Sequence, residues 1–449
     1  MKLSQSKPLA ASLVAILAFS TNLYAGLDTA VAQPGSSLGQ SAGALGSVAY
    51  LTPPQAVNPG QALREPAPWS GANRNSGLDL AESQSPPPGA VAGEPLRQVP
   101  LNPAVGLANA GQQFRFSYTT TDQHGAIATS TAALFTPQGH PPKGGWPVLA
   151  WAHGTVGLAD QCTPSMNPRS DRDAAYLNHW LEQGYAIVAS DYAGLGTPGL
   201  MSYLNGTATA ASMVDSVIAA HKLSTPAVQL SHKWAVIGQS QGGGAALHVA
   251  QSASARSVPA GLDYVGAVAT GAPAYIEELV LAAGPTFPPV PLPAALNAYA
   301  GYIVAGFREA RPNIDVDSVL TDEGKRWVAA AETACYTELA DAVRGMNVAR
   351  AFSSPLSSVP GLEPALREYM ETPATGYDKP VFLAHGMKDI DVPSPIGIML
   401  NSSMWINQFI GAEGTRNNRV EVHWYPTDHG QTVPVSLADS TPFLRGLFG

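Results

Sequence analysis

Short apolar segments recur along the chain from about residue 101, and segments with helical periodicity separate most of them. Residues 113–118 and 126–135 alternate apolar and polar side chains, as strands buried on one face do, and can pair as an antiparallel hairpin. Residues 147–152 form a more continuous apolar run, which is typical of a strand buried on both faces. Further strands are predicted at 185–190, 233–238, 264–269, 380–384 and 420–425. Helices are predicted at 173–183, 208–221, 245–252 and 396–410, and near the C-terminus. This alternation predicts an α/β fold with a mostly parallel central sheet, right-handed crossovers and flanking helices.

The alternation stops at about residue 275 and resumes at about residue 378. The segment between is mostly helical, with proline-rich connections and helices expected at 323–342 and 362–371. We interpret residues 275–377 as a helical cap inserted into a core formed by residues 101–274 and 378–449. Its apolar side chains can line an acyl pocket or form the core of the cap itself; they include Phe287, Val290, Leu292, Tyr299, Tyr302, Ile303 and Phe307.

The first 25 residues have the composition of a targeting segment. Lys2 and Lys7 precede an apolar run, residues 9–19, that is too short to span a membrane. Leu23-Tyr24-Ala25 is typical of a signal-peptidase site, so we expect residues 1–25 to be a signal peptide and the protein to be secreted, into the periplasm or the medium. An uncleaved anchor helix is the alternative.

Residues 26–100 are rich in Ala, Gly, Ser, Pro and Gln and show no lasting helical or strand period. We expect this segment to be a low-complexity, disordered or loosely attached leader. A propeptide and a cell-surface linker are both compatible with it.

The chain has 449 residues, which suits one large catalytic domain with insertions or two small domains. Its formal net charge of −9, without a local cluster of Lys and Arg, argues against nucleic acid as the main partner. Cys162 and Cys335 are its two cysteines. In an oxidising compartment they can form a disulfide, and otherwise they are buried free thiols. Neither has a second Cys or His at ligand spacing, so no metal site is expected.

The sequence Gly238-Gln239-Ser240-Gln241-Gly242 follows an apolar strand and opens a helix. This order predicts a sharp turn that lifts Ser240 to the carboxyl end of the sheet as a nucleophile; an ordinary strand-to-helix turn is the alternative. Glycines are needed because the turn is strained and neighbouring chain passes close by. The backbone amide of Gln241 points from the helix N-terminus, where it can stabilise developing negative charge.

A nucleophilic serine needs a base, and the base needs a carboxylate to orient it. Asp389 follows a predicted strand at the same sheet edge as Ser240, with Asp391 as its competitor and a turn cap as the other role for Asp391. His429 follows the last strand in a polar segment that we expect to be a flexible turn, whereas His423 lies within that strand. We therefore predict Ser240, Asp389 and His429 as nucleophile, acid and base.

The second donor to an oxyanion is expected in the loop after the strand at 147–152. That loop contains His153-Gly154-Thr155-Val156-Gly157. The backbone amide of Thr155 is our prediction, and that of Gly157 is the alternative. We expect His153 to brace the loop rather than to act as a base.

These motifs together resemble the secretory lipase family of the α/β-hydrolases, of which Candida antarctica lipase A is typical. The motifs are Trp146-Pro147-Val148, His153 to Gly157, Asp160 to Ser165, Ser190 to Gly196, Gly238 to Gly243 and His385 to Pro393. The resemblance implies the α/β-hydrolase fold with an inserted cap, carboxylic-ester hydrolysis, the Ser240-Asp389-His429 triad, and a disulfide from Cys162 to a cap cysteine, for which Cys335 is the candidate. Thr163 departs from the alanine usual after that first cysteine, and the leader has no counterpart.

We therefore expect a secreted serine esterase or lipase that works through an acyl-enzyme and needs neither metal nor cofactor. Its partner is an ester or lipid substrate, with transient contact to a lipid or polymer surface. An exported serine peptidase or amidase on the same fold is the nearest rival. A non-catalytic surface protein, in which the leader is the functional part, is the rival from another class.

Overall fold

The computed structural model describes residues 62–72, 74–75, 78, 86–226, 228–287, 292–410 and 414–449. The predicted signal peptide and most of the leader lie outside the described residues. The strands form one nine-stranded sheet in the order β1-β2-β3-β5-β4-β6-β7-β8-β9. Their bounds are β1 Pro95–Pro100, β2 Ala110–Thr121, β3 Ile127–Pro137, β4 Trp146–Ala152, β5 Ala186–Ser190, β6 Leu230–Gln239, β7 Asp263–Thr270, β8 Val381–Gly386 and β9 Val420–Tyr425.

The sheet has an antiparallel part and a parallel part. β1, β2, β3 and β5 pair antiparallel in that order, and the hairpin of β2 with β3 is confirmed. From β5 through β4, β6, β7 and β8 to β9 every pairing is parallel. The carboxyl ends of these parallel strands therefore share one edge of the sheet.

Helices cover both faces of the sheet because the central strands are apolar on both. Val148 and Ala150 of β4 join the core beneath α4, α5 and α11, whereas Leu149 and Trp151 join the core beneath α3, α12 and α13. The bounds of these helices are α3 Asp171–Glu182, α4 Gly206–Lys222, α5 Gln241–Ser257, α11 Ser394–Ile406, α12 His429–Val435 and α13 Leu437–Phe448. This is the α/β architecture, with a mostly parallel sheet between helices, that the alternating pattern predicted.

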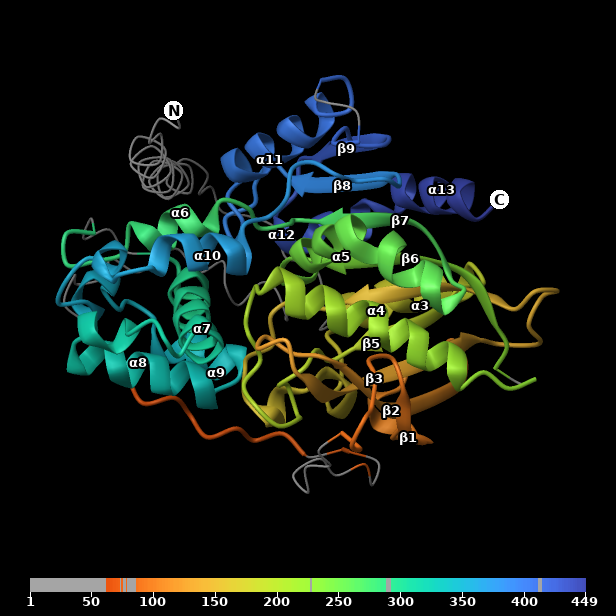
Figure 1. Ribbon diagram of the computed structural model, residues 1–449, viewed down its shortest axis with the longest axis horizontal. Helices are drawn as coiled ribbons and strands as arrows, with labels where there is room; N and C mark the ends of the chain where they lie inside the picture. Colours follow the sequence, from red (N-terminus) through yellow and green to blue (C-terminus); the bar gives the residue numbers. More distant parts are fainter. Residues whose placement is uncertain are drawn as a thin grey trace, which may run out of the picture.

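The chain between β7 and β8 forms a layer of cap helices, which Figure 1 shows gathered beyond the carboxyl end of β8. They are α6 Ile276–Leu281, α7 Ala294–Ala310, α8 Asp322–Thr333, α9 Tyr336–Ala342 and α10 Leu362–Met370. Of the apolar side chains expected to line a pocket or fill the cap, Tyr302, Ile303 and Phe307 are fully buried. Val290 lies outside the described residues.

The helix expected over residues 323–342 is in fact two helices, α8 and α9. Ala334 and Cys335 between them are extended, and Cys335 forms a β-bridge with Gly157 and a disulfide with Cys162. The Cα atoms of the two cysteines are 5.5 Å apart, across a sequence separation of 173 residues. The break in the helix brings Cys335 against the loop after β4, so the disulfide joins cap to core and the free-thiol alternative is excluded.

Regular structure begins before residue 101, within the segment that we expected to be a leader. β1 escaped the sequence pattern because it is an edge strand, bounded by Pro95 and Pro100, with its side chains half-buried or exposed. Earlier still, the amide of Leu63 donates to Glu323 Oε1 of α8 at 3.3 Å, and Arg115 Nη1 donates to the carbonyl of Leu78 at 3.0 Å. Part of the leader therefore lies along both cap and core. In the described part of the chain, every helix is too short or too polar to cross a bilayer.

Candidate active site

Ser240 lies at the turn between β6 and α5 with φ 57° and ψ −124°. A positive φ is strained for a residue with a side chain, and such strain is held where the surroundings over-determine it. A Cβ at Gly238 would overlap the carbonyl of Gly242, and one at Gly242 would overlap the carbonyl of Ala152. The two glycines are therefore required by close backbone packing, as the sequence pattern predicted.

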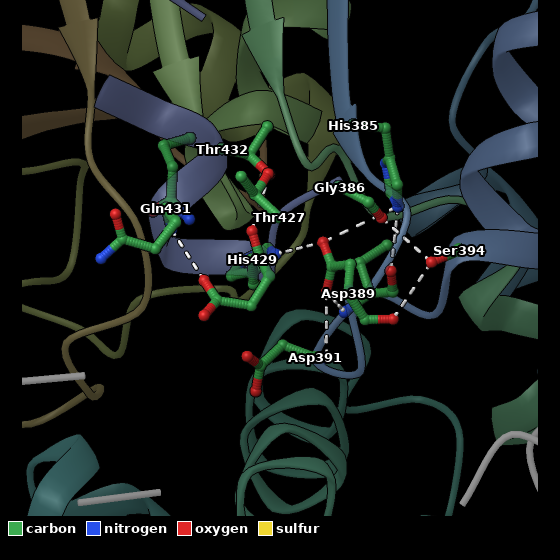
Figure 2. Close-up of polar contacts among 12 residues, drawn as sticks. His385, Gly386, Asp389, Asp391, Ser394, Thr427, His429, Gln431 and Thr432 are labelled. Carbon is green, nitrogen blue, oxygen red and sulfur yellow. Dashed lines mark hydrogen bonds and ion pairs between the residues drawn. The ribbon is translucent and has the colours of Figure 1, made fainter. Parts of the chain in front are cut away.

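Asp389 and His429 form a buried pair at the carboxyl end of the sheet, which Figure 2 shows. The Nδ1 of His429 is 2.6 Å from Oδ2 of Asp389, and the Asp389 side chain is fully buried. The other carboxylate oxygen, Oδ1, accepts the backbone amides of Asp391 at 3.0 Å and Val392 at 2.8 Å. These bonds fix the orientation of the carboxylate, so that one oxygen faces the imidazole.

His429 is the first residue of α12, not part of a flexible turn. Asp428 caps this helix by accepting the amide of Gln431 at 2.8 Å, which positions His429 rigidly. Burial lowers the pKa of His429, but the charge of Asp389 and the hydrogen bond to it outweigh this, so the pKa is raised from 6.5. Among the described residues, Nε2 of His429 is buried without a hydrogen-bond partner.

Asp391 and His423 were the alternatives to Asp389 and His429, and neither forms the acid–base hydrogen bond. Asp391 contributes its backbone amide, not its carboxylate, to the Asp389–His429 pair. His423 stays in β9, where its ring stacks on Phe382 with centroids 4.6 Å apart. The structure thus pairs the two residues that we preferred. The Asp391 carboxylate lies beside this pair without a hydrogen bond to it, and His423 packs in β9.

The loop after β4 lies against the serine. A Cβ at Gly154 would lie 3.7 Å from the Cβ of Ser240, and the Thr155 hydroxyl is 2.5 Å from that of Tyr203. Gly157 faces the disulfide instead, since a Cβ added to Gly157 would lie 2.8 Å from the Cα of Cys335. The geometry therefore favours the amide of Thr155 over that of Gly157.

His153 has the bracing contacts that we expected. Its ring stacks on Tyr192 with centroids 4.2 Å apart, and Nδ1 is 2.7 Å from the carbonyl oxygen of Gly154. Burial lowers the pKa of His153, so the imidazole is neutral at neutral pH.

Gly271, directly after β7, is a site residue that the sequence analysis missed. A Cβ there would lie 2.8 Å from Cε1 and 2.9 Å from Nδ1 of His429. The imidazole therefore rests against the backbone of Gly271. A glycine at the carboxyl end of a core strand was the available signal, but such glycines are common in turns.

The side chains of Asp389, Asp391 and His429 each offer one ligand atom, and these atoms lie within 4.8 Å of one another. Such a cluster can in principle hold a cation. Here, however, Nδ1 of His429 is engaged by Asp389, and Oδ1 of Asp389 accepts two amides. The donor set fits an acid–base pair better than a metal centre.

The comparisons with known proteins agree with this architecture. The model of the secretory lipase family matches residues 169–357. Candida antarctica lipase A in its closed state has a TM-score of 0.65 at 18% identity, over 85% of this chain and 87% of that one. A mutant of the rice cell wall degrading esterase LipA from Xanthomonas oryzae has a TM-score of 0.62 at 20% identity, over 80% of this chain and 100% of that one. A putative hydrolase from Legionella pneumophila has a TM-score of 0.62 at 18% identity, over 79% and 98%. No curated protein matches the chain.

The structural likenesses establish the fold, and the family match adds the class. The protein is an α/β-hydrolase and a carboxylic ester hydrolase of the lipase and esterase type. The resemblance to the secretory lipase family, drawn above from the motifs, is confirmed.

Proposed function

We propose that the protein is a secreted serine hydrolase that cleaves carboxylic esters through an acyl-enzyme. The observation that carries this proposal is the state of His429: Asp389 engages Nδ1, and Nε2 is buried without a partner. A buried nitrogen that lacks a partner is costly unless a substrate or a reacting group completes it. The strained turn at Ser240 supplies the hydroxyl that such a base would serve.

Each residue then has one task. Asp389 accepts the Nδ1 proton of His429, which leaves Nε2 as the basic nitrogen that takes the proton of Ser240 during attack on the ester carbonyl. The negative charge of Asp389 stabilises the imidazolium that results. The imidazolium returns its proton to the leaving alcohol, and the same residues then activate water for hydrolysis of the acyl-enzyme.

The oxyanion of each tetrahedral intermediate needs two donors. We assign them to the backbone amides of Gln241 and Thr155. Gln241 is the first residue of α5, so its amide has no partner within the helix and carries the positive end of the helix dipole. Loss of one such donor typically costs about 10²–10³-fold in kcat.

The substrate class follows from the family and the cap. Lipases and esterases share this scaffold, and we propose an ester or lipid substrate with transient contact to a lipid or polymer surface. Export is supported by the disulfide, which persists in oxidising compartments, and by the basic and apolar N-terminal sequence. N-terminal sequencing of the exported protein is expected to begin at Gly26; a retained Met1 would favour the anchor helix.

The serine assignment is tested by Ser240→Ala, with Ser252→Ala of α5 as the matched control. We expect S240A to lose both hydrolysis of 4-nitrophenyl esters and labelling by a fluorophosphonate probe, while S252A keeps both. An S240A protein that still turns over the ester would contradict the assignment. Matched ester and amide substrates with the same acyl group, assayed side by side, distinguish the esterase from the peptidase.

A further inference from the structure

Asp391 holds a carboxylate that the triad does not use. It is half-buried, and its carboxylate oxygens have no hydrogen bond or ion pair from the described residues. An unpaired carboxylate in a partly buried site costs free energy, and such groups concentrate where a substrate supplies the missing partner.

The carboxylate lies beside the base, because one of its oxygens is within 4.8 Å of a ring nitrogen of His429. Figure 2 shows Asp391 next to Asp389 and His429, and one carboxylate oxygen of Asp391 lies within 4.8 Å of one of Asp389. The charge of Asp391 raises the pKa of Tyr299 on α7, after the larger effect of burial. It raises the pKa of Tyr203 in the same way, and the Tyr203 hydroxyl bonds that of Thr155 in the proposed oxyanion loop.

Charged groups of both signs surround Asp391. Its pKa is raised: burial has the largest effect and Asp389 and Asp428 add to it, whereas His429 and Arg172 lower it by less. The guanidinium of Arg172 is engaged elsewhere, 2.8 Å from Asp173. The carboxylate thus remains available to a group that binds next to His429.

We propose that Asp391 selects substrates by charge. Its carboxylate favours esters whose groups near the scissile bond are neutral or cationic and disfavours those that carry a negative charge. It also repels the carboxylate product once the acyl-enzyme is hydrolysed. This inference rests on the proposed ester hydrolysis and adds the charge class of the substrate.

The test compares three 4-nitrophenyl esters of similar acyl length: a neutral pentanoate, an anionic glutarate monoester and a cationic trimethylammoniobutanoate. Each substrate is assayed with wild type, Asp391→Asn and Asp391→Ser. The control is Asp263→Asn, which makes the same change at an exposed position at the amino end of β7. Ratios of kcat/KM between two esters in one sample cancel any difference in the fraction of folded enzyme.

We expect Asp391→Asn to raise the ratio of kcat/KM for the anionic ester to that for the neutral ester by about tenfold, and to lower the ratio for the cationic ester to the neutral one. Asp391→Ser is expected to change both ratios in the same directions, and Asp263→Asn to leave both unchanged. In wild type the discrimination weakens as salt increases. Ratios that stay within about twofold of wild type in both Asp391 variants, while the neutral ester is hydrolysed, overturn charge selection alone. Absence of hydrolysis of all three esters overturns the proposed function, and this inference with it.

Discussion

Gly271 lies beneath the imidazole of His429, and a methyl group there is expected to displace the ring. The added Cβ would be 2.8 Å from Cε1, whereas carbon atoms pack at about 3.5–4.0 Å, so ring or backbone must move by about 1 Å. The backbone cannot yield easily, because the amide of Gly271 donates to the carbonyl of Ala384 at 2.8 Å. A misplacement of about 1 Å costs about 10²-fold in rate, so we expect kcat of Gly271→Ala to fall by about 10²-fold.

Gly261 provides the matched control. Both glycines have positive φ, 57° at Gly271 and 71° at Gly261, but a Cβ at Gly261 meets nothing within 4 Å. Each alanine therefore carries a backbone cost of about 1 kcal/mol in stability, and only the one at Gly271 reaches the base. The assay is kcat and KM for the neutral 4-nitrophenyl ester, with thermal unfolding of both variants. A G271A enzyme with the kcat of wild type would refute the reasoning, as would an equal loss in G261A.

Four further outcomes are expected. Asp389→Asn lowers kcat by about 10³–10⁴-fold because an amide no longer enforces the reactive tautomer of His429, and steady-state kinetics with circular dichroism separate this from unfolding. Because the pKa of His429 is raised from 6.5, kcat/KM falls as pH drops through that raised value, and a pH profile with an acid limb at or below 6.5 would contradict the pair. The stability of the fold depends on pH in the opposite direction to kcat/KM. The Asp389–His429 pair stabilises the folded state fully below pH 6.5, and this contribution is lost as pH rises through the raised pKa of His429. Thermal unfolding of the Ser240→Ala variant at several pH values measures it. Replacing Cys162 and Cys335 with serine lowers the unfolding free energy by up to about 5 kcal/mol in denaturant titrations, and a loss below experimental error would show that the disulfide does not constrain the chain.

Much of the site could be predicted because its signals are local. The glycines around Ser240 follow from backbone crowding at one turn, and Asp389 and His429 each come directly after a strand whose apolar run is evident. That Asp389 and His429 come close together could also be predicted, because the carboxyl ends of parallel strands lie at one edge of the sheet. What local patterns could not provide is the choice between Asp389 and Asp391, two residues apart. The two amides that orient the Asp389 carboxylate made that choice.

The expectations that differed from the structure depended on contacts between distant segments. β1 has no apolar alternation of its own, and it forms a strand because its backbone pairs antiparallel with β2. The helix expected over 323–342 breaks at Cys335 because Cys162 and Gly157 lie opposite it. His429 is the exception, since it begins a helix rather than a turn because its neighbour Asp428 caps that helix, which is a local contact.

The amino-acid sequence by itself therefore determined the alternation of strands and helices, the strained turn at Ser240 and the types of side chain at the sheet edge, because backbone sterics and apolar periodicity act over a few residues. Only the tertiary structure decided which carboxylate bonds His429, that Gly271 supports its ring, and that the Asp391 carboxylate stays beside them without a hydrogen bond from the described residues. Those outcomes depend on distances between segments that are about 40 residues or more apart in the chain, and local sequence pattern carries no information on such distances.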